Sequence, residues 1–254
     1  MALFTDGPIA TIEELADHDG GVLEVANTES INLTRKLAIA QEEIGVELAA
    51  LLPQLKSFDE QYVGDPRPLE SVVVTAPLRL WHIYHTLELV YRDAYYNQLN
   101  DRYQAKWKEH IELAKWAAEK VMETGVGMAA DPLPMAPAPQ VQVVNGSLAA
   151  GTYFVTVAWV NGRGEEGASP AAQAVAVDTG MTFQASMGAA PGNAQGWNVY
   201  AGTSADELVL QNASLLDPHD VWLQPAGVTT NGAGPSGGQR PTYLRALPRV
   251  IQRG

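Results

Sequence analysis

The sequence predicts an α+β protein with helices in its first part and strands in its second. Apolar residues recur every three or four positions up to about residue 125, as in helices, and alternate with other residues from about residue 140, as in strands. Composition changes at the same place, because residues 1–135 hold 11 basic and 22 acidic residues while residues 136–254 hold 5 and 7. The proline-rich stretch at residues 131–140 is predicted to be a semi-rigid linker, since proline favours extended backbone.

Residues 1–130 are predicted to form an antiparallel helical bundle. Thr11 and Glu14 fit a capping box that opens a short helix. Asp101 is a favourable first residue for the last helix, and Gly125 is suited to end it. Short connections between long amphipathic helices favour antiparallel packing. The expected apolar stripes are Leu33, Leu37, Ala40, Ile44, Leu48, Leu51 and Leu55; Leu80, Tyr84, Leu87, Tyr91 and Ala94; and Tyr103, Trp107, Ile111, Ala114, Ala118 and Val121.

Residues 141–231 show the alternation of half-buried strands. Tyr153, Val155, Val157 and Trp159 face one side of a predicted strand, and Asn161-Gly162 follows as a two-residue hairpin signal. Roughly seven short strands separated by turn residues are typical of an immunoglobulin-like or fibronectin-like β-sandwich. The chain has no cysteine, so a domain of the antibody type with its disulfide is excluded.

Residues 232–254 are predicted to be a glycine-rich lead-in followed by a basic arm. Residues 239–254 contain four arginines and no acidic residue, and apolar residues are interleaved with the arginines. Two prolines in this stretch argue against a long regular helix. A cationic, partly apolar segment on an acidic chain indicates an extended docking arm.

Charge and motif content exclude several functions. The chain of 254 residues has 16 basic and 29 acidic residues, a net charge of −13, so wrapping of nucleic acid is not expected. No signal peptide is expected, and no run of about 18 apolar residues would cross a membrane. The sequence has no phosphate-binding loop, zinc-protease motif or serine-hydrolase motif, so neither enzymatic activity nor a cofactor is expected.

Three histidines offer a weak metal hypothesis. His82 and His85 are three residues apart on a predicted helix, so both could face one ion, and His110 on another helix could supply a third ligand. The simpler interpretation, which we favour, places the first two on a packed or interfacial helix face beside Trp81 and Tyr84.

Aromatic residues are concentrated on the last two predicted helices. They occupy more than one helical face, and a bundle of this size cannot easily bury all of them. Tryptophan and tyrosine are enriched at protein interfaces, so core packing alone and core packing plus a subunit interface are both open. The candidate interface residues are Trp81, Tyr84, Tyr91, Tyr95, Trp107 and Trp116.

Residues 80–120 (LWHIYHTLELVYRDAYYNQLNDRYQAKWKEHIELAKWAAEK), preceded by residues 33–53, resemble the helical module of head-to-tail connector proteins of tailed bacteriophages. Residues 151–170 and 196–204 resemble the Ig-like domains found in phage structural proteins. Many connectors lack such a sandwich, so the resemblance leaves its role open.

The resemblance implies a virion protein that is made in the host cytoplasm and located at the neck between capsid and tail. Connector subunits form a ring, usually of twelve copies, under the portal protein. The ring extends the DNA channel, through which DNA passes without specific binding, and offers a platform to tail or neck proteins. A C-terminal tail commonly reaches into the portal. The corresponding arm residues here are Arg240, Tyr243, Leu244, Arg245, Leu247, Arg249, Val250, Ile251 and Arg253.

Two other functions remain open from the sequence. The first is a peripheral capsid or tail protein whose Ig-like domain binds the host surface. The second is a helical metalloenzyme that uses His82, His85 and an acid, with the sandwich as a carbohydrate-binding appendage.

Overall fold

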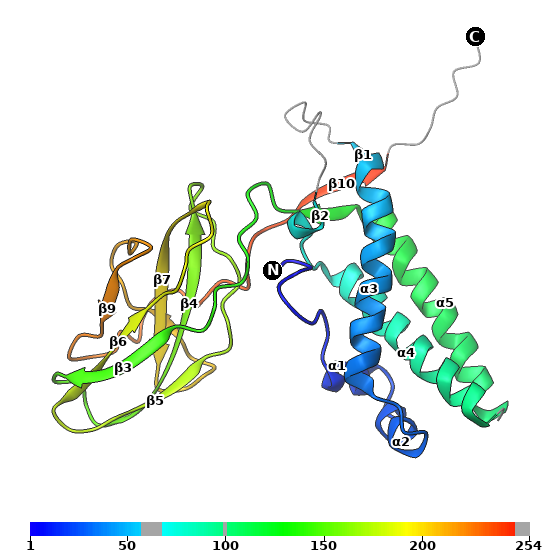
Figure 1. Cartoon of the computed structure of the whole chain (residues 1–254), viewed down its shortest axis with the longest axis horizontal. Helices are drawn as coiled ribbons and strands as arrows, with labels where there is room; N and C mark the ends of the chain where they lie inside the picture. Colours follow the sequence, from blue (N-terminus) through cyan, green and yellow to red (C-terminus); the bar gives the residue numbers. More distant parts are fainter. Residues whose placement is uncertain (57–67, 99–100, 247–254) are drawn as a thin grey trace, which may run out of the picture. The chain divides into compact units, whose positions relative to one another are not determined.

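The computed structural model describes residues 1–56, 68–98 and 101–246, and it shows an α+β protein with an N-terminal helical region followed by antiparallel sheets (Figure 1). The chain divides into two compact units. The helical unit contains Gly7–Met128 and Pro241–Gly254, and the β unit contains Met1–Asp6 and Ala129–Arg240. The β unit is therefore inserted into the helical unit along the chain, whereas the sequence predicted that it follows a complete helical domain at residues 1–130.

The helical unit is built around two long helices, because α4 packs along α5 and α3 lies against α4 (Figure 1). The predicted helices are confirmed, and a short additional helix, α2, was not predicted. The long stripe predicted from Leu33 to Leu55 stops being helical at Leu51, where Pro53 enters a 3-10 turn. The helices of this unit are α1 (Ile12–His18), α2 (Val22–Thr28), α3 (Leu33–Leu51), α4 (Ala76–Gln98) and α5 (Asp101–Thr124), with 3-10 turns η1 (Leu52–Gln54) and η3 (Leu69–Ser71).

Local capping explains where the first helices begin. At α1, the Thr11 hydroxyl accepts from the Glu14 N–H at 3.2 Å and the Glu14 carboxylate accepts from the Thr11 N–H at 2.8 Å, which is the predicted capping box. Asn32 caps α3 by accepting from the Arg35 N–H at 2.9 Å. Besides these caps, burial of the apolar stripe of each helix stabilises the helix against its neighbours. The buried stripe of α3 is Leu33, Leu37, Ala40, Ile44 and Leu48.

The helical unit also contains a small antiparallel sheet with the strand order β1-β10-β2. Leu244 in the central strand is opposite Val126 and only 5% exposed. Gly125 has φ +96°, and a Cβ there would press against the backbone of Leu244, so only glycine allows this close approach. The strands are β1 (Leu55–Lys56), β2 (Val126–Met128) and β10 (Thr242–Ala246).

The β unit contains two antiparallel sheets, one with the order β3-β6-β9 and one with the order β5-β4-β7-β8. Side chains from both sheets share one core, in which Trp159 and Trp197 are directly opposite each other and Phe183 comes from the other sheet. The strands are β3 (Gln140–Asn145), β4 (Gly151–Asn161), β5 (Gln173–Val177), β6 (Met181–Ser186), β7 (Ala194–Gly202), β8 (Val209–Leu210) and β9 (Val221–Leu223).

The predicted hairpin at Asn161-Gly162 is wrong in its detail. The chain does turn there, but the reversal spans Asn161 to Glu165 and is completed by Gly164 at φ +74°. The Asn161 carboxamide oxygen accepts from the N–H groups of Arg163 and Glu165, each at 3.0 Å. This side chain therefore stabilises a wider loop than the dipeptide signal predicts.

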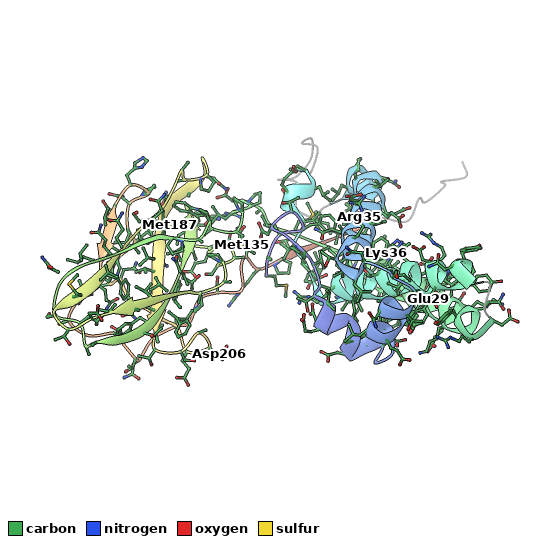
Figure 2. All side chains as sticks on the ribbon, turned by 60° about the horizontal axis from the view of Figure 1, so that its bottom comes forward. Glu29, Arg35, Lys36, Met135, Met187 and Asp206 are labelled. Carbon is green, nitrogen blue, oxygen red and sulfur yellow. The ribbon has the colours of Figure 1, made fainter. Side chains whose placement is uncertain are left out.

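The predicted linker at residues 131–140 is part of the β-unit core. Leu133 and Ala136 are buried among the strands, and the Leu133 N–H donates to the Gln239 side chain at 2.6 Å. The Met135 N–H donates to Asp6 at 2.7 Å, and Met135 is labelled in Figure 2. Proline spacing alone predicted a semi-rigid linker between two domains, but the apolar residues between the prolines are stabilised by burial in the β-unit core.

The predicted flexible lead-in at residues 232–238 also belongs to the β unit. Gly238, at φ +103°, passes so close to Met1 that a Cβ would overlap the Met1 carbonyl. The adjacent Gln239 is buried, and its amide donates to the Asp131 carbonyl at 2.8 Å and to Glu165 at 3.0 Å. These bonds hold the chain in place just before it returns to the helical unit.

Candidate functional site

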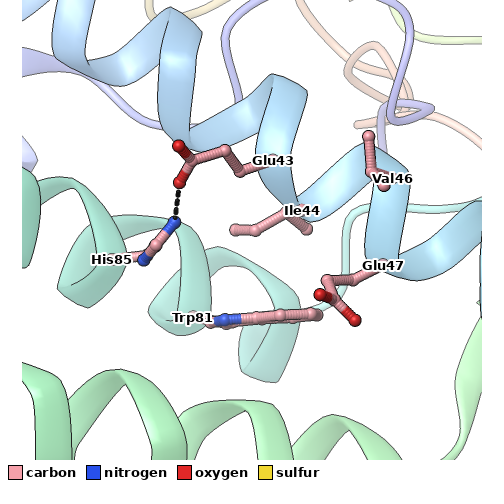
Figure 3. A pocket seen from close by; sticks show the side chains of 6 residues that line it. All are labelled: Glu43, Ile44, Val46, Glu47, Trp81 and His85. Atoms are coloured by element: carbon pink, nitrogen blue, oxygen red, sulfur yellow. Dashed lines mark hydrogen bonds and ion pairs between the residues drawn. The ribbon is translucent and has the colours of Figure 1, made fainter.

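A groove lies between α3 and α4 in the helical unit (Figure 3). Its volume is about 420 Å³. Ile44 and the broad face of Trp81 line it, and Val46 at its edge is 70% exposed. The remaining lining residues are Glu43, Glu47 and His85. The groove thus combines apolar surface with two carboxylates.

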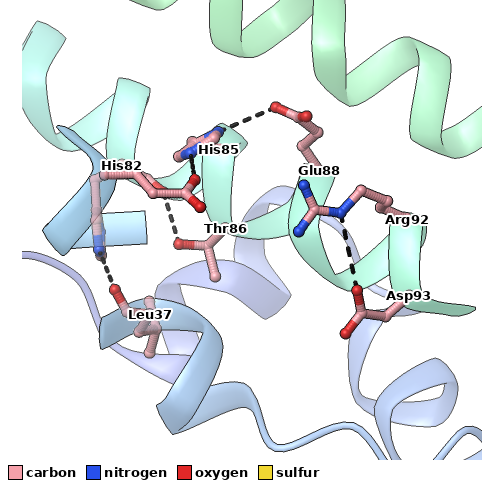
Figure 4. Close-up of polar contacts among 8 residues, drawn as sticks. Leu37, His82, His85, Thr86, Glu88, Arg92 and Asp93 are labelled. Carbon is pink, nitrogen blue, oxygen red and sulfur yellow. Dashed lines mark hydrogen bonds and ion pairs between the residues drawn. The ribbon is translucent and has the colours of Figure 1, made fainter. Parts of the chain in front are cut away.

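His85 connects the two helices at the side of the groove. Its Nε2 lies 2.6 Å from Glu43 of α3 (Figure 3). Its Nδ1 lies 3.0 Å from Glu88 of α4 (Figure 4). Burial lowers the pKa of His85, but the hydrogen bonds to Glu88 and Glu43 outweigh it, so the pKa lies above its ordinary value. The protonated ring is therefore favoured here, as a cation between two carboxylates. Glu47 has no ion-pair partner within the described residues.

His82 is a core residue rather than a ligand. It is fully buried, and its Nε2 lies 2.9 Å from the Leu37 carbonyl (Figure 4). Burial lowers its pKa, so the ring is neutral and Nε2–H donates to that carbonyl. His110 instead contacts Asp19 at 3.1 Å. The structure thus gives the three histidines separate partners, and no group of three metal-ligating side chains occurs in the described part of the chain.

A buried polar centre forms around Asp19, at the junction of α1 and α2. Its carboxylate accepts from the Tyr91 hydroxyl at 3.0 Å and the Gly21 N–H at 2.9 Å, and it lies 3.1 Å from His110 and 3.2 Å from Lys106. Burial raises the pKa of Asp19, but these hydrogen bonds outweigh it and the pKa lies below its ordinary value. Burial lowers the pKa of His110, so its neutral ring donates to the carboxylate. The sequence analysis missed this centre, whose members are up to 91 residues apart.

The candidate interface aromatics occupy different environments. Tyr91 is 3% exposed and stacks on His110, with ring centroids 5.2 Å apart, so its assignment to a subunit interface was wrong. Trp81 is also buried, at 8% exposed, and lines the groove. Tyr84 is half-buried, with its ring against His18. Helix periodicity could not distinguish the buried aromatic residues from the exposed ones, because an aromatic residue fits the pattern of a core stripe and of an interface stripe equally well.

The other candidate aromatics are more accessible. Tyr95 and Trp107 are half-buried and stack with centroids 5.7 Å apart, and Tyr96 completes this cluster near the end of α4. Trp116 on α5 is 44% exposed. These residues, unlike Tyr91, leave aromatic surface for a partner.

The first part of the predicted arm belongs to the sheet of the helical unit. Residues 242–246 form β10, the central strand of that sheet. The Leu244 side chain is buried within the helical unit, so it cannot fill a pocket on another protein. Arg245 is exposed, and its Nε donates to the Thr124 carbonyl at 3.3 Å. Arg240 and Tyr243 are also exposed. The remaining arm residues, Leu247, Arg249, Val250, Ile251 and Arg253, lie outside the described residues.

The outer face of the β3-β6-β9 sheet carries no charge. Gln142 and Gln184 are paired across β3 and β6 and share a hydrogen bond of 3.0 Å. Leu223 is opposite Gln184 on the same face and is 54% exposed, and Val221 is similarly exposed. This face contrasts with the strongly acidic composition of the whole chain.

No protein-family model and no curated protein sequence matches this chain. In the described residues, no helix is long and apolar enough to cross a membrane.

Proposed function

We propose that the chain is a structural subunit of a tailed-bacteriophage virion, the head-to-tail connector, which forms a ring of about twelve copies under the portal protein. One observation carries the proposal. The two segments that resemble the connector module, residues 33–53 and 80–120, pack together as α3, α4 and α5 of one helical unit. The role is structural rather than catalytic, and the protein is located at the virion neck.

The surface of the helical unit supports assembly with other copies. Trp116, Tyr96 and Met122 expose apolar side chains on α4 and α5. Exposed aromatics are favourable interface residues, because they bury large area at little entropic cost. In the ring, these residues contact neighbouring copies, and the net charge of −13 per copy repels DNA from the channel wall.

Two finer features belong to the same proposal. The β unit, with two antiparallel sheets around one core, is an Ig-like sandwich that contacts neighbouring capsid, neck or tail proteins. The portal anchor is the basic segment from Leu247 onward, since residues 242–246 are held within the helical unit. Charge pairs steer such docking, and apolar anchors hold it.

The test is electron microscopy of particles made without this protein, combined with its copy number in wild-type particles. We expect DNA-filled or leaky heads without tails, and about twelve copies per wild-type particle, the ring size that the resemblance implies. Trp116→Glu should give the same defect, whereas Glu112→Gln on the same helix should not. Complete, infectious particles without the protein would contradict the connector function.

A second function, attachment to the host surface, is favoured by the uncharged outer face of the β3-β6-β9 sheet. Exposed Leu223 and Val221 beside a glutamine pair provide a flat surface for a neutral partner such as a glycan. If this function holds, particles with Leu223→Asp assemble normally but adsorb poorly. Assembly failure with normal adsorption of the remaining particles favours the connector.

A further inference from the structure

The strand β3 is a free edge of the β unit. It lies at the end of the sheet order β3-β6-β9, so β6 is its one neighbouring strand in the described part of the chain. With six residues it is longer than the other edge strands β5, β8 and β9, and its register with β6 runs without a bulge. An edge strand presents unpaired N–H and C=O groups, which can pair with a strand of another molecule.

The hydrogen bonds of β6 show which backbone groups of β3 are free. Along an antiparallel pair, residues alternate between those that bond to the partner strand and those that point away from it. The Gln224 N–H donates to the Phe183 carbonyl at 2.9 Å, so Phe183, opposite Val143, bonds on the β9 side. The Gly146 N–H donates to the Gly180 carbonyl at 3.0 Å, which gives the same alternation. The residues whose N–H and C=O groups face the free edge are therefore Val141, Val143 and Asn145.

The edge of β3 lacks the features that normally prevent strand pairing. Natural edge strands are blocked by a charge, a proline, a bulge or a covering segment. The edge of β8 is covered in this way, because the Leu210 N–H donates to the Ala233 carbonyl at 3.0 Å. β3 contains neither a charge nor a proline, and three of its six residues are valine, which favours strands. Val143 is 43% exposed at this edge. The edge is therefore open to an uncharged strand.

A second copy of the chain fits this edge, because β3 is complementary to itself. When two copies pair antiparallel about a two-fold axis at Val143, this residue is opposite its own counterpart and Val141 is opposite Asn145. Every outward residue then meets an outward residue of the other copy, and the exposed Val143 side chains cover each other. Two copies with a net charge of −13 repel each other, but β3, β6 and β9 contain no charged residue. This edge thus allows close approach.

We propose that two copies of the chain pair through β3 in solution, antiparallel about a two-fold axis at Val143. The pairing joins the two β3-β6-β9 sheets into one continuous sheet. A two-fold contact closes on itself, so it does not propagate round a ring. The dimer is therefore a state of the free protein, and the proposal does not depend on the connector function.

Amide hydrogen exchange of the full-length protein, followed by NMR, tests the pairing. The measurement uses the Trp116→Glu variant, which removes the aromatic contact proposed for the ring. We expect the amides of Val141 and Val143 to exchange at least about tenfold more slowly at about 200 μM than at about 1 μM protein. The amides of Gln142 and Val144, which bond to β6, are the internal control and should be protected at both concentrations. Exchange at Val143 that does not depend on concentration would overturn the proposal.

Substitutions in the same background identify the strand that pairs. Proline is tolerated in an edge strand where its nitrogen faces outward, so Val143→Pro should keep the fold and raise the dimer Kd at least about tenfold in sedimentation equilibrium. Gln142→Lys should also raise the Kd, because it brings two cations close to the axis, and it keeps the test decisive if the proline variant unfolds. The matched control is Ala176→Lys, at an exposed position of the edge strand β5, which should leave the Kd unchanged.

Three results would overturn the pairing through β3. The first is a protein that stays monomeric at about 200 μM, well above the Kd at which exchange would be slowed. The second is a dimer that neither Val143→Pro nor Gln142→Lys weakens. The third is a dimer that Ala176→Lys weakens instead, which would place the contact at β5. Unchanged circular dichroism confirms that each variant is folded, and none of these results bears on the connector function.

Discussion

The Tyr91 hydroxyl donates a hydrogen bond of 3.0 Å to Asp19, so a residue in the middle of α4 is tied to the turn between α1 and α2. The same carboxylate accepts from His110 on α5. Three parts of the helical unit therefore converge on one buried charge. Such a charge is stable only while its hydrogen-bonding partners stay in place.

Replacing Asp19 should strongly destabilise the helical unit. Asp19→Ala leaves the Tyr91 hydroxyl and the His110 ring buried without their acceptor, which costs about 2–4 kcal/mol of unfolding free energy. Urea denaturation followed by circular dichroism measures the change. Asp17→Ala, two residues away and exposed, is the matched control and should change stability by less than about 0.5 kcal/mol. Equal effects of the two changes would contradict a structural role for the Asp19 centre.

His85 should make stability depend on pH. Its pKa is raised in the folded chain, so its stabilising effect is complete below the unfolded value of about 6.5 and is lost as the pH rises through the folded value. We expect His85→Gln to lose about 0.5–1 kcal/mol of unfolding free energy near pH 6, discounted because Glu43 is half exposed, and less near pH 9. His219→Gln, at an exposed position, is the control for the substitution itself and should change the unfolding free energy by less than about 0.5 kcal/mol. If the unfolding free energy lost in His85→Gln grows as the pH rises, the pKa of His85 is lowered rather than raised in the folded chain.

Leu244 should behave as a core residue. Leu244→Ala removes buried side-chain volume from the sheet beside Val126 and should cost about 2–4 kcal/mol. Tyr243→Ala on the exposed side of the same strand should cost less than about 1 kcal/mol. Urea denaturation of both variants distinguishes a core strand from a free arm at residues 242–246, because a free arm would tolerate both changes equally.

The helical unit should fold without the β unit. Met128 and Thr242 are opposite each other in register, so replacing residues 129–241 with Asn-Gly joins β2 to β10 through a tight hairpin. Residues 1–6 belong to the β unit and are removed as well. We expect a helical protein with one cooperative thermal transition, measured by circular dichroism. A chain that stays unfolded would show that the helical unit depends on the inserted domain.

Local patterns predicted the elements well. The stripe from Leu33 to Leu48 and the capping box at Thr11 need only neighbouring residues, and both are present in the structure. The strand at Tyr153 to Trp159 was likewise evident from its alternation. Helix and strand periodicities are local properties, so a sequence displays them directly.

The predictions failed where distant segments meet. The linker residues Leu133 and Ala136 became part of a core because strands from elsewhere cover them. Likewise, Tyr91 became a buried hydrogen-bond donor because Asp19, 72 residues earlier, lies beside it. No periodicity records such pairings, since they depend on how complete elements pack.

The sequence by itself determined the division into helical and β regions, the acidic charge and the basic composition of residues 239–254. Only the tertiary structure decided that the β unit is inserted, that residues 242–246 are the centre of a sheet, and which aromatics remain exposed. The physical reason is that composition and periodicity reflect the local preference of a few neighbouring residues for helix, strand or loop. The pairing of β10 with β2, by contrast, joins backbone groups more than a hundred residues apart, and its stability comes from burying Leu244.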